Sequence, residues 1–175
     1  MKAVVFTEAS DTVDKNAQTL LEYYKGQFRP VASLVQELSN FADTDLYILS
    51  DEFGVSQGSL SVSELTPASD RPQVRDHVQS LLLTEVEDAD IIILLLTKSV
   101  FTEILKPVWN DLTEKSMDDS IWGLGIPQSV LDELNLNSLR TKRDLHIYPR
   151  VGVARIDTKT RRSILDAVEA KTNSN

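Results

Sequence analysis

The stretch ADIIILLL, residues 89–96, decides the fold. Its last six residues, 91–96, are all apolar, which is typical of a strand buried on both faces in a parallel sheet. Shorter runs at 3–7 and 45–49 predict two further strands, and we expect both to lie beside the central one. The sequence therefore predicts an α/β fold built around residues 91–96.

Helical patterns alternate with these strands. Gly26 is expected to end a helix over 16–25, and Pro30 lies in the first turn of a helix reaching about Phe41. A long polar segment, 51–72, then precedes a helix that Asp70 would cap. The remaining expected elements are a helix at 99–115, a strand at 120–122, a short helix at 127–134, strands at 144–148 and 151–156, and a helix at 158–171.

This alternation predicts a three-layer, Rossmann-like α/β sandwich with a mostly parallel central sheet. We expect one domain over residues 1–171 and a frayed tail over 172–175. The composition agrees, because 41% hydrophobic and 26% charged residues are ordinary values for a globular chain of 175 residues.

The absence of cysteine excludes disulfides, zinc thiolates and thiol nucleophiles. The longest apolar run has six residues, far fewer than a membrane span needs. The amino-terminal stretch is too small for a signal peptide. We therefore expect a cytoplasmic protein that makes no membrane contact.

The net charge of −9 disfavours nucleic-acid binding, which depends on Lys and Arg at phosphates. Both a halophilic source and an ordinary acidic cytoplasmic protein agree with it. Residues 140–175 nevertheless carry a net +5. We favour internal pairing of these basic groups within an ordered segment at 140–162. The alternative is a phosphate-binding or nucleic-acid-facing patch, in which Arg150 and Arg155 would hold the phosphate.

Polar residues follow several predicted strands. In open α/β sheets, ligands bind beyond the carboxyl ends of the strands. Each residue alone is explained by capping or solvation, but the group suits a small polar ligand such as a nucleoside or nucleotide. The candidates are Glu8, Ser50 and Asp51 as catalytic residues, and Thr7, Thr97, Lys98, Gly123 and Gly125 as ligand-binding residues.

Other chemistries find no motif here. Gly123-x-Gly125 lacks the third glycine of a dinucleotide fingerprint, and the phosphate-loop pattern GxxxxGK[ST] is missing. His77 and His146 have no nucleophile-elbow context, so we expect both to be partly exposed structural residues. Without an HExxH or similar cluster, neither a metal nor another cofactor is expected.

Two segments resemble a known pattern: LLEYYKGQFRPV at 20–31 and LYILSDEFGV at 46–55. The pattern, YxGxF followed by LSxxFG, is that of a family of small uncharacterised α/β proteins, distantly similar to the core of archaeosine-synthase-type tRNA-modification enzymes. The resemblance covers residues 3–134. It implies that Tyr24, Gly26, Phe28, Ser50, Phe53 and Gly54 form the site.

The sequence departs from the family after the first strand, where relatives have a Cys-Ser-x-x-Lys-like stretch and this chain has FTEAS at 6–10. We therefore favour a nucleotide-, nucleoside- or partner-binding module that has lost the family's cysteine. The alternative is a nucleoside- or nucleobase-handling transferase or hydrolase. In that enzyme Glu8 is the general acid/base, while Ser50 and the backbone near Gly54 fix the ligand. The sequence does not predict an oligomeric state.

Overall fold

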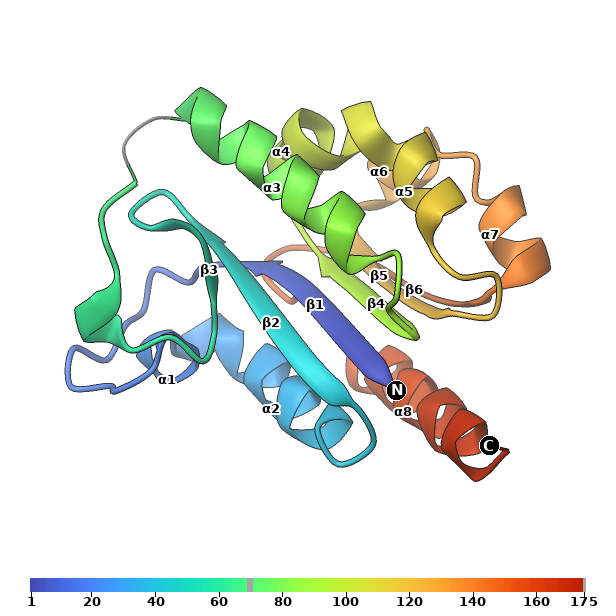
Figure 1. Cartoon of the computed structure of the whole chain (residues 1–175), viewed down its shortest axis with the longest axis horizontal. Coiled ribbons are helices and arrows are strands. Elements are labelled where there is room, and N and C mark those ends of the chain that lie inside the picture. Colours follow the sequence, from blue (N-terminus) through green and yellow to red (C-terminus); the bar gives the residue numbers. More distant parts are fainter. Residues whose placement is uncertain (69–70, 175) are drawn as a thin grey trace.

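The computed structural model describes residues 1–68 and 71–174, with the backbone alone for 71–73. Its middle layer is a six-stranded sheet in the order β3-β2-β1-β4-β5-β6 (Figure 1). All neighbours are parallel except β2 and β3. The strands are β1 (Lys2–Glu8), β2 (Asp43–Ser50), β3 (Gly54–Gln57), β4 (Ile91–Leu95), β5 (Ile121–Ile126) and β6 (Asp144–Pro149).

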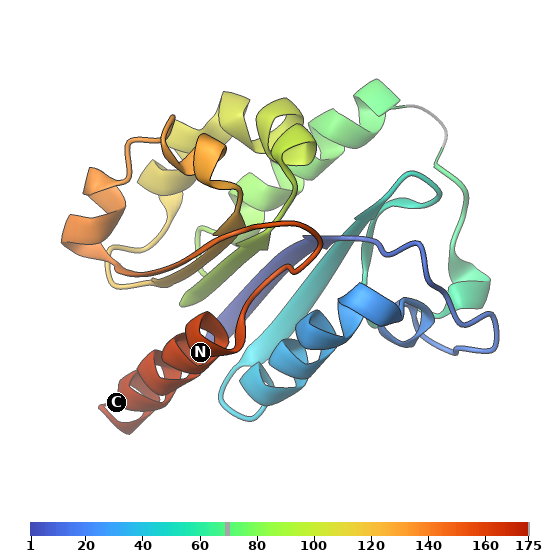
Figure 2. The ribbon, with the colours of Figure 1, turned by 180° about the vertical axis from the view of Figure 1, so that it is seen from behind.

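Helices cover both faces of this sheet, which confirms the predicted α/β sandwich (Figures 1 and 2). One face carries α1 (Leu20–Tyr23), α2 (Arg29–Leu38) and α8 (Thr158–Asn173). The other carries α3 (Arg71–Glu85), α4 (Lys98–Val100), α5 (Trp109–Lys115), α6 (Gln128–Leu131) and α7 (Asn137–Lys142). In the part of the chain that is described, no helix is long and apolar enough to cross a membrane.

Strand β4 is central and fully buried, as predicted. Its side chains alternate between two cores: Ile92 and Leu94 pack toward α3 and α5, whereas Ile93 and Leu95 pack toward α2 and α8. β1 lies beside it, but β2 lies beyond β1. The expectation that residues 45–49 adjoin the central strand is therefore wrong, because the connection through α3 carries the chain past β1.

The helix expected over 16–25 is reduced to α1. Thr19 caps it, and Tyr24 is already extended and bridges to Val13. The polar residues before it have no apolar face to bury, and α1 itself bonds through Leu20 N–H to the Leu60 carbonyl. Gly26 adopts φ +59° and begins the 3-10 turn η1 (Gly26–Phe28) rather than ending a helix.

The next helix, α2, has Pro30 in its first turn as predicted, but ends at Leu38 rather than near Phe41. The polar segment after β2 contains β3, which the sequence pattern did not indicate, and the 3-10 turn η2 (Val62–Glu64). Gly54 begins β3 at φ +67° and makes the tight reversal from β2 possible. The expected cap, Asp70, lies outside the described residues.

The helix expected at 99–115 is interrupted. After α4 come a π-helical turn, η3 (Phe101–Leu105), and a 3-10 turn, η4 (Lys106–Val108). Pro107 lacks an N–H group and disturbs the helical hydrogen-bond ladder, which explains the break before α5. The strand expected at 120–122 is β5, which continues to Ile126.

The basic segment is ordered, as predicted. β6 and α8 confirm two of its elements, but residues 151–156 form no strand. Residues 150–157, here called the crossover segment, run from β6 across the carboxyl edge of the sheet to α8 (Figure 2). Val151 and Val153 are 79% and 63% exposed, so their alternation does not reflect a buried strand. α8 includes Thr172 and Asn173, which we expected in the tail.

Internal pairing of the basic groups is confirmed for several of them. Arg161 pairs with Glu37 at 2.6 Å, and Lys171 lies 3.5 Å from Asp90. Arg143 is buried and donates to the Thr113 carbonyl at 2.6 Å. These contacts attach the positive segment to the acidic remainder of the chain.

Candidate functional site

A cavity of about 710 Å³ opens at the carboxyl ends of β1 and β2, beside the start of α4. After β1 the chain turns toward α1 and α2, and after β4 it turns toward α4 on the opposite face. Diverging connections of this kind open a crevice between neighbouring parallel strands. We call this cavity the carboxyl-edge crevice; it is lined by residues 8–11, 13, 23–24, 49–52, 74–75, 99–100 and 103–104.

Glu8, the last residue of β1, links this strand to the segment that follows β4. Its carboxylate accepts hydrogen bonds from the Thr97 N–H at 2.5 Å and the Thr97 hydroxyl at 2.9 Å. Arg150 Nη1 lies 3.8 Å from the same carboxylate. Glu8 is therefore held in one orientation at the wall of the crevice. Thr97, which we expected to bind the ligand, instead uses its N–H and its hydroxyl to bond Glu8.

Ser50 is the last residue of β2 and lines the crevice. It also makes a hydrogen bond within the protein. Its hydroxyl accepts from the Phe53 N–H at 2.9 Å, which shapes the turn into β3. Burial raises the pKa of the Tyr24 hydroxyl, and a hydrogen bond with Ser50 opposes that shift. No histidine is among the described residues lining the crevice, so Ser50 has no imidazole base there.

Carboxylates dominate the lining. Five of the described lining residues are acidic, whereas one, Arg75, is basic. Arg75 is itself close to an acid, with its Nε 3.3 Å from Asp76. A lining of this sign attracts cationic ligands, does not repel uncharged ones and repels phosphates. The five acidic residues are Glu8, Asp11, Asp51, Glu52 and Glu103.

These carboxylates do not form a metal centre. Across residues 1–68 and 71–174, no three acidic or imidazole side chains are placed to hold a metal ion. His77 is exposed on α3. His146 lies on β6, where its Nδ1 is 2.8 Å from the Ser163 hydroxyl.

Arg155 binds the chain at the end of β1, next to the residues that line the crevice. Its guanidinium donates to the Thr7 hydroxyl at 2.8 Å, to the Ala9 carbonyl at 2.5 Å and to the Glu8 carbonyl. It also lies 5.7 Å above the ring of Phe28. Burial lowers the pKa of Arg155 to about 10, and the neighbouring Arg150 adds to the effect. The expectation that Arg155 binds a phosphate is contradicted, because the carbonyls of Glu8 and Ala9 already accept hydrogen bonds from its guanidinium.

We expected Gly123 and Gly125 to form a flexible segment after a strand at 120–122. This is wrong, because both glycines lie inside β5. A Cβ at Gly123 would lie 2.7 Å from the end of Ile164. One at Gly125 would overlap the Arg155 carbonyl oxygen. Both glycines therefore allow the crossover segment and α8 to pack closely on β5, and neither lines the crevice.

The other expected site residues lie around the crevice rather than in it. Gly26 and Gly54 supply left-handed turns at its margin. Phe53 packs its ring 6.4 Å from that of Tyr23, and Lys98 is exposed at the start of α4. Arg150 is 9% exposed, and its Nη1 has no hydrogen-bond partner in the described part of the molecule.

The structure thus brings together four of the expected residues, Glu8, Tyr24, Ser50 and Asp51. The expectations missed Tyr23, Asp11, Arg75, Ser99 and Glu103, which line the same cavity. Tyr23 lies within the segment LLEYYKGQFRPV, residues 20–31, directly before Tyr24. Ser99 and Glu103 are four positions apart, a spacing that places both on one face of a helix.

No protein-family model matches the chain, and no match was found among the curated proteins. The resemblance carried by residues 20–31 and 46–55 therefore stays a prediction.

Proposed function

We propose that the chain binds an uncharged or cationic nucleoside in the carboxyl-edge crevice and releases it unchanged. The observation that carries the proposal is the cavity itself, which combines hydroxyls, carboxylates and two tyrosines at the carboxyl ends of β1 and β2. Its volume is within the range of small-molecule sites. Carboxylates and hydroxyls match the hydroxyl and amino groups of a nucleoside.

The position of the acids supports a ribose contact. The strand order is that of doubly wound dinucleotide-binding sheets, with β3 reversed, and in those folds an acid downstream of the first βα turn bonds the ribose hydroxyl. Asp51 and Glu52 follow β2 directly and line the crevice. They are the residues that we propose to contact the sugar.

The phosphate half of such a site is missing. The segment after β1, residues 9–12, contains no glycine, and two nitrogens of the Arg155 guanidinium donate to the carbonyls of Glu8 and Ala9 rather than to a ligand. The crevice also has an excess of carboxylates among its described residues. We therefore propose that nucleosides bind more tightly than their phosphates.

The alternative is a nucleoside-handling transferase or hydrolase that uses Glu8 as general acid/base. The observation in its favour is the fixed orientation of Glu8, held by Thr97 and faced by Arg150. A positioned carboxylate at a ligand cavity is what general acid/base catalysis needs. Product formation separates this enzyme from a binding module.

The test incubates the protein with adenosine, guanosine, cytidine, uridine and their 5′-monophosphates, following the melting temperature and, by chromatography, the products. We expect at least one nucleoside to raise the melting temperature more than its monophosphate does, without product. Product formation that Glu8→Gln abolishes would support the enzyme instead. A larger shift with the monophosphates, or no shift with any compound, would contradict the proposal.

A charge variant sharpens the test. Replacing Glu52 and Glu103 together by Gln removes two lining charges, so the preference for nucleoside over monophosphate should fall about threefold to tenfold. The matched control is Glu64→Gln, an exposed acid of η2 that does not line the crevice. An unchanged preference in the double variant would show that the lining charge does not select the ligand.

A further inference from the structure

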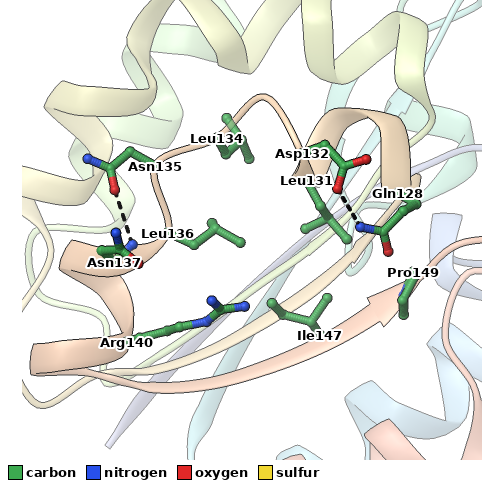
Figure 3. Close-up of a pocket in the computed structure, with 10 residues that line it drawn as sticks. All are labelled: Gln128, Leu131, Asp132, Leu134, Asn135, Leu136, Asn137, Arg140, Ile147 and Pro149. Atoms are coloured by element: carbon green, nitrogen blue, oxygen red, sulfur yellow. Dashed lines mark hydrogen bonds between the residues drawn. The ribbon is translucent and has the colours of Figure 1, made fainter.

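A second cavity, of about 450 Å³, lies far from the strand ends of β1 and β2, between β6 and the segment that contains α6 and α7 (Figure 3). Its apolar part comes from Leu131, Leu134 and Leu136, with Ile147 on the strand side. Arg140 extends from α7 toward Ile147 in the same view. The cavity therefore joins an apolar pocket to a guanidinium.

The strand beside this cavity is an edge strand, because β6 pairs with β5 alone. Asp144 N–H and Arg150 N–H donate to carbonyls on the β5 side, those of Ser120 and Ile126. Since main-chain groups alternate along a strand, the N–H and C=O groups of Leu145 and Ile147 point away from the sheet. Within the described residues, these groups have no main-chain partner.

Arg140 is a second unpaired group at this place. It is exposed, and no ion pair or hydrogen bond of its side chain occurs within the described residues. The neighbouring cations are engaged: Lys142 lies 3.2 Å from Asp118, and Arg143 donates to main-chain carbonyls. The acid of the pocket, Asp132, accepts from Gln128 at 2.7 Å. A carboxylate from outside would thus find Arg140 available.

We propose that β6 and this cavity form a docking groove for an extended segment of another protein, with an acidic residue and an apolar residue two positions apart. The segment adds a strand to β6 by bonding the outward groups of Leu145 and Ile147. Alternate side chains of such a strand point to the same face, about 7 Å apart. One carboxylate then meets Arg140 while the apolar side chain enters the leucine-lined pocket.

A second copy of this chain does not fit the groove as well. Each copy carries a net charge of −9, so two copies repel each other. The acid that β6 itself offers, Asp144, is 3.2 Å from His146 Nε2. Residues 144 and 146 share one face of the strand, and His146 bonds Ser163 of α8 on the face opposite the cavity. A paired β6 would therefore present no carboxylate to Arg140.

The experiment uses the full chain and a capped, fluorescent peptide, Ser-Thr-Glu-Val-Leu-Thr-Ser, with a second peptide in which Gln replaces Glu. Binding is followed by anisotropy, and hydrogen exchange of single amides by NMR. We expect the first peptide to slow the exchange of the Leu145 and Ile147 amides. Arg140→Gln should weaken binding about tenfold, because a charge-assisted hydrogen bond is lost.

The two changes should not add, because they remove the same contact: Arg140→Gln with the Gln peptide should bind as either single change does. The matched control, Arg162→Gln, removes an exposed cation of α8 and should leave binding unchanged. Unprotected amides at residues 145 and 147, or additive losses, would overturn the proposal. Concentration-dependent protection without peptide would make this edge an interface between copies and would also overturn it.

Discussion

The carboxyl edge of the sheet has an open half and a closed half. Beyond β1 and β2 lies the carboxyl-edge crevice, lined mostly by side chains that end in carboxylates and hydroxyls. Beyond β5 the same edge is covered by the crossover segment, whose Arg155 carbonyl lies against Gly125. The difference shows that the path of one connection, rather than the polarity of the strand ends, decides where a cavity remains.

The largest effect is expected at Arg155, whose side chain ties the crossover segment of the closed half to the end of β1 in the open half. Replacing Arg155 by Met keeps an apolar stem but leaves the Glu8 and Ala9 carbonyls and the Thr7 hydroxyl without their donor. Unsatisfied buried acceptors are costly, so we expect the free energy of unfolding to fall by about 3 kcal/mol, measured by urea denaturation. Arg162→Met, at an exposed position of α8, should change it by less than about 0.5 kcal/mol.

An Arg155→Met protein as stable as the wild type would mean that the crossover segment merely lies on the edge without closing it. The contrast between the open and the closed half of the carboxyl edge would then rest on the path of the crossover segment's main chain alone, and not on side-chain bonds that fix this segment to the sheet.

A smaller effect is expected at the glycines of β5. Gly125→Ala places a Cβ against the Arg155 carbonyl, which is main chain and cannot turn aside, so we expect a loss of about 2 kcal/mol. Gly123→Ala meets the end of the Ile164 side chain, which can rotate, so its loss should be about 1 kcal/mol. Thermal unfolding of both variants measures the difference. A larger loss for Gly123→Ala would contradict the close approach of the crossover segment to β5.

The smallest effect is expected in the open half, at Tyr24. Burial raises the pKa of its hydroxyl above the ordinary 10.0, while the hydrogen bond with Ser50 opposes the shift. Above pH 10 the unfolded chain loses this proton before the folded chain does, so the contribution of Tyr24 to stability, complete below pH 10, declines as the pH rises. Urea denaturation between pH 9 and 11 should show a shallower decline for Tyr24→Phe than for the wild type. Equal slopes in the two proteins would contradict burial of this hydroxyl.

The sequence indicated the elements whose apolar pattern is unambiguous. The run at 91–96 has no polar face, and α2 has Val31, Leu34 and Leu38 at helical spacing, so β4 and α2 follow from burial alone. Part of the crevice was also predictable, because the carboxyl ends of parallel strands meet at one edge. Glu8 and Ser50, at the ends of β1 and β2, lie in one cavity for that reason.

What the sequence could not indicate depends on main-chain neighbours. Val151 and Val153 alternate as in a strand, yet no strand among residues 1–68 and 71–174 pairs with them, and both are exposed. Arg155 has the composition of a phosphate ligand, but carbonyl oxygens from residues 8 and 9 take its donors. Gly125 has the appearance of a loop glycine, while its actual role is to admit another segment's backbone. Such contacts are set by the order of the strands, which local patterns do not encode.

The bond between Arg155 and Thr7 also has a consequence for how the protein is made. The two residues are separated by 148 positions, so β1 leaves the ribosome long before the guanidinium that bonds the Thr7 hydroxyl and the Glu8 carbonyl exists. Contacts so distant in sequence form late and slow the folding of the whole domain. Until residue 155 has been translated, the end of the first strand lacks these hydrogen bonds, and incompletely folded chains of this kind are prone to aggregation.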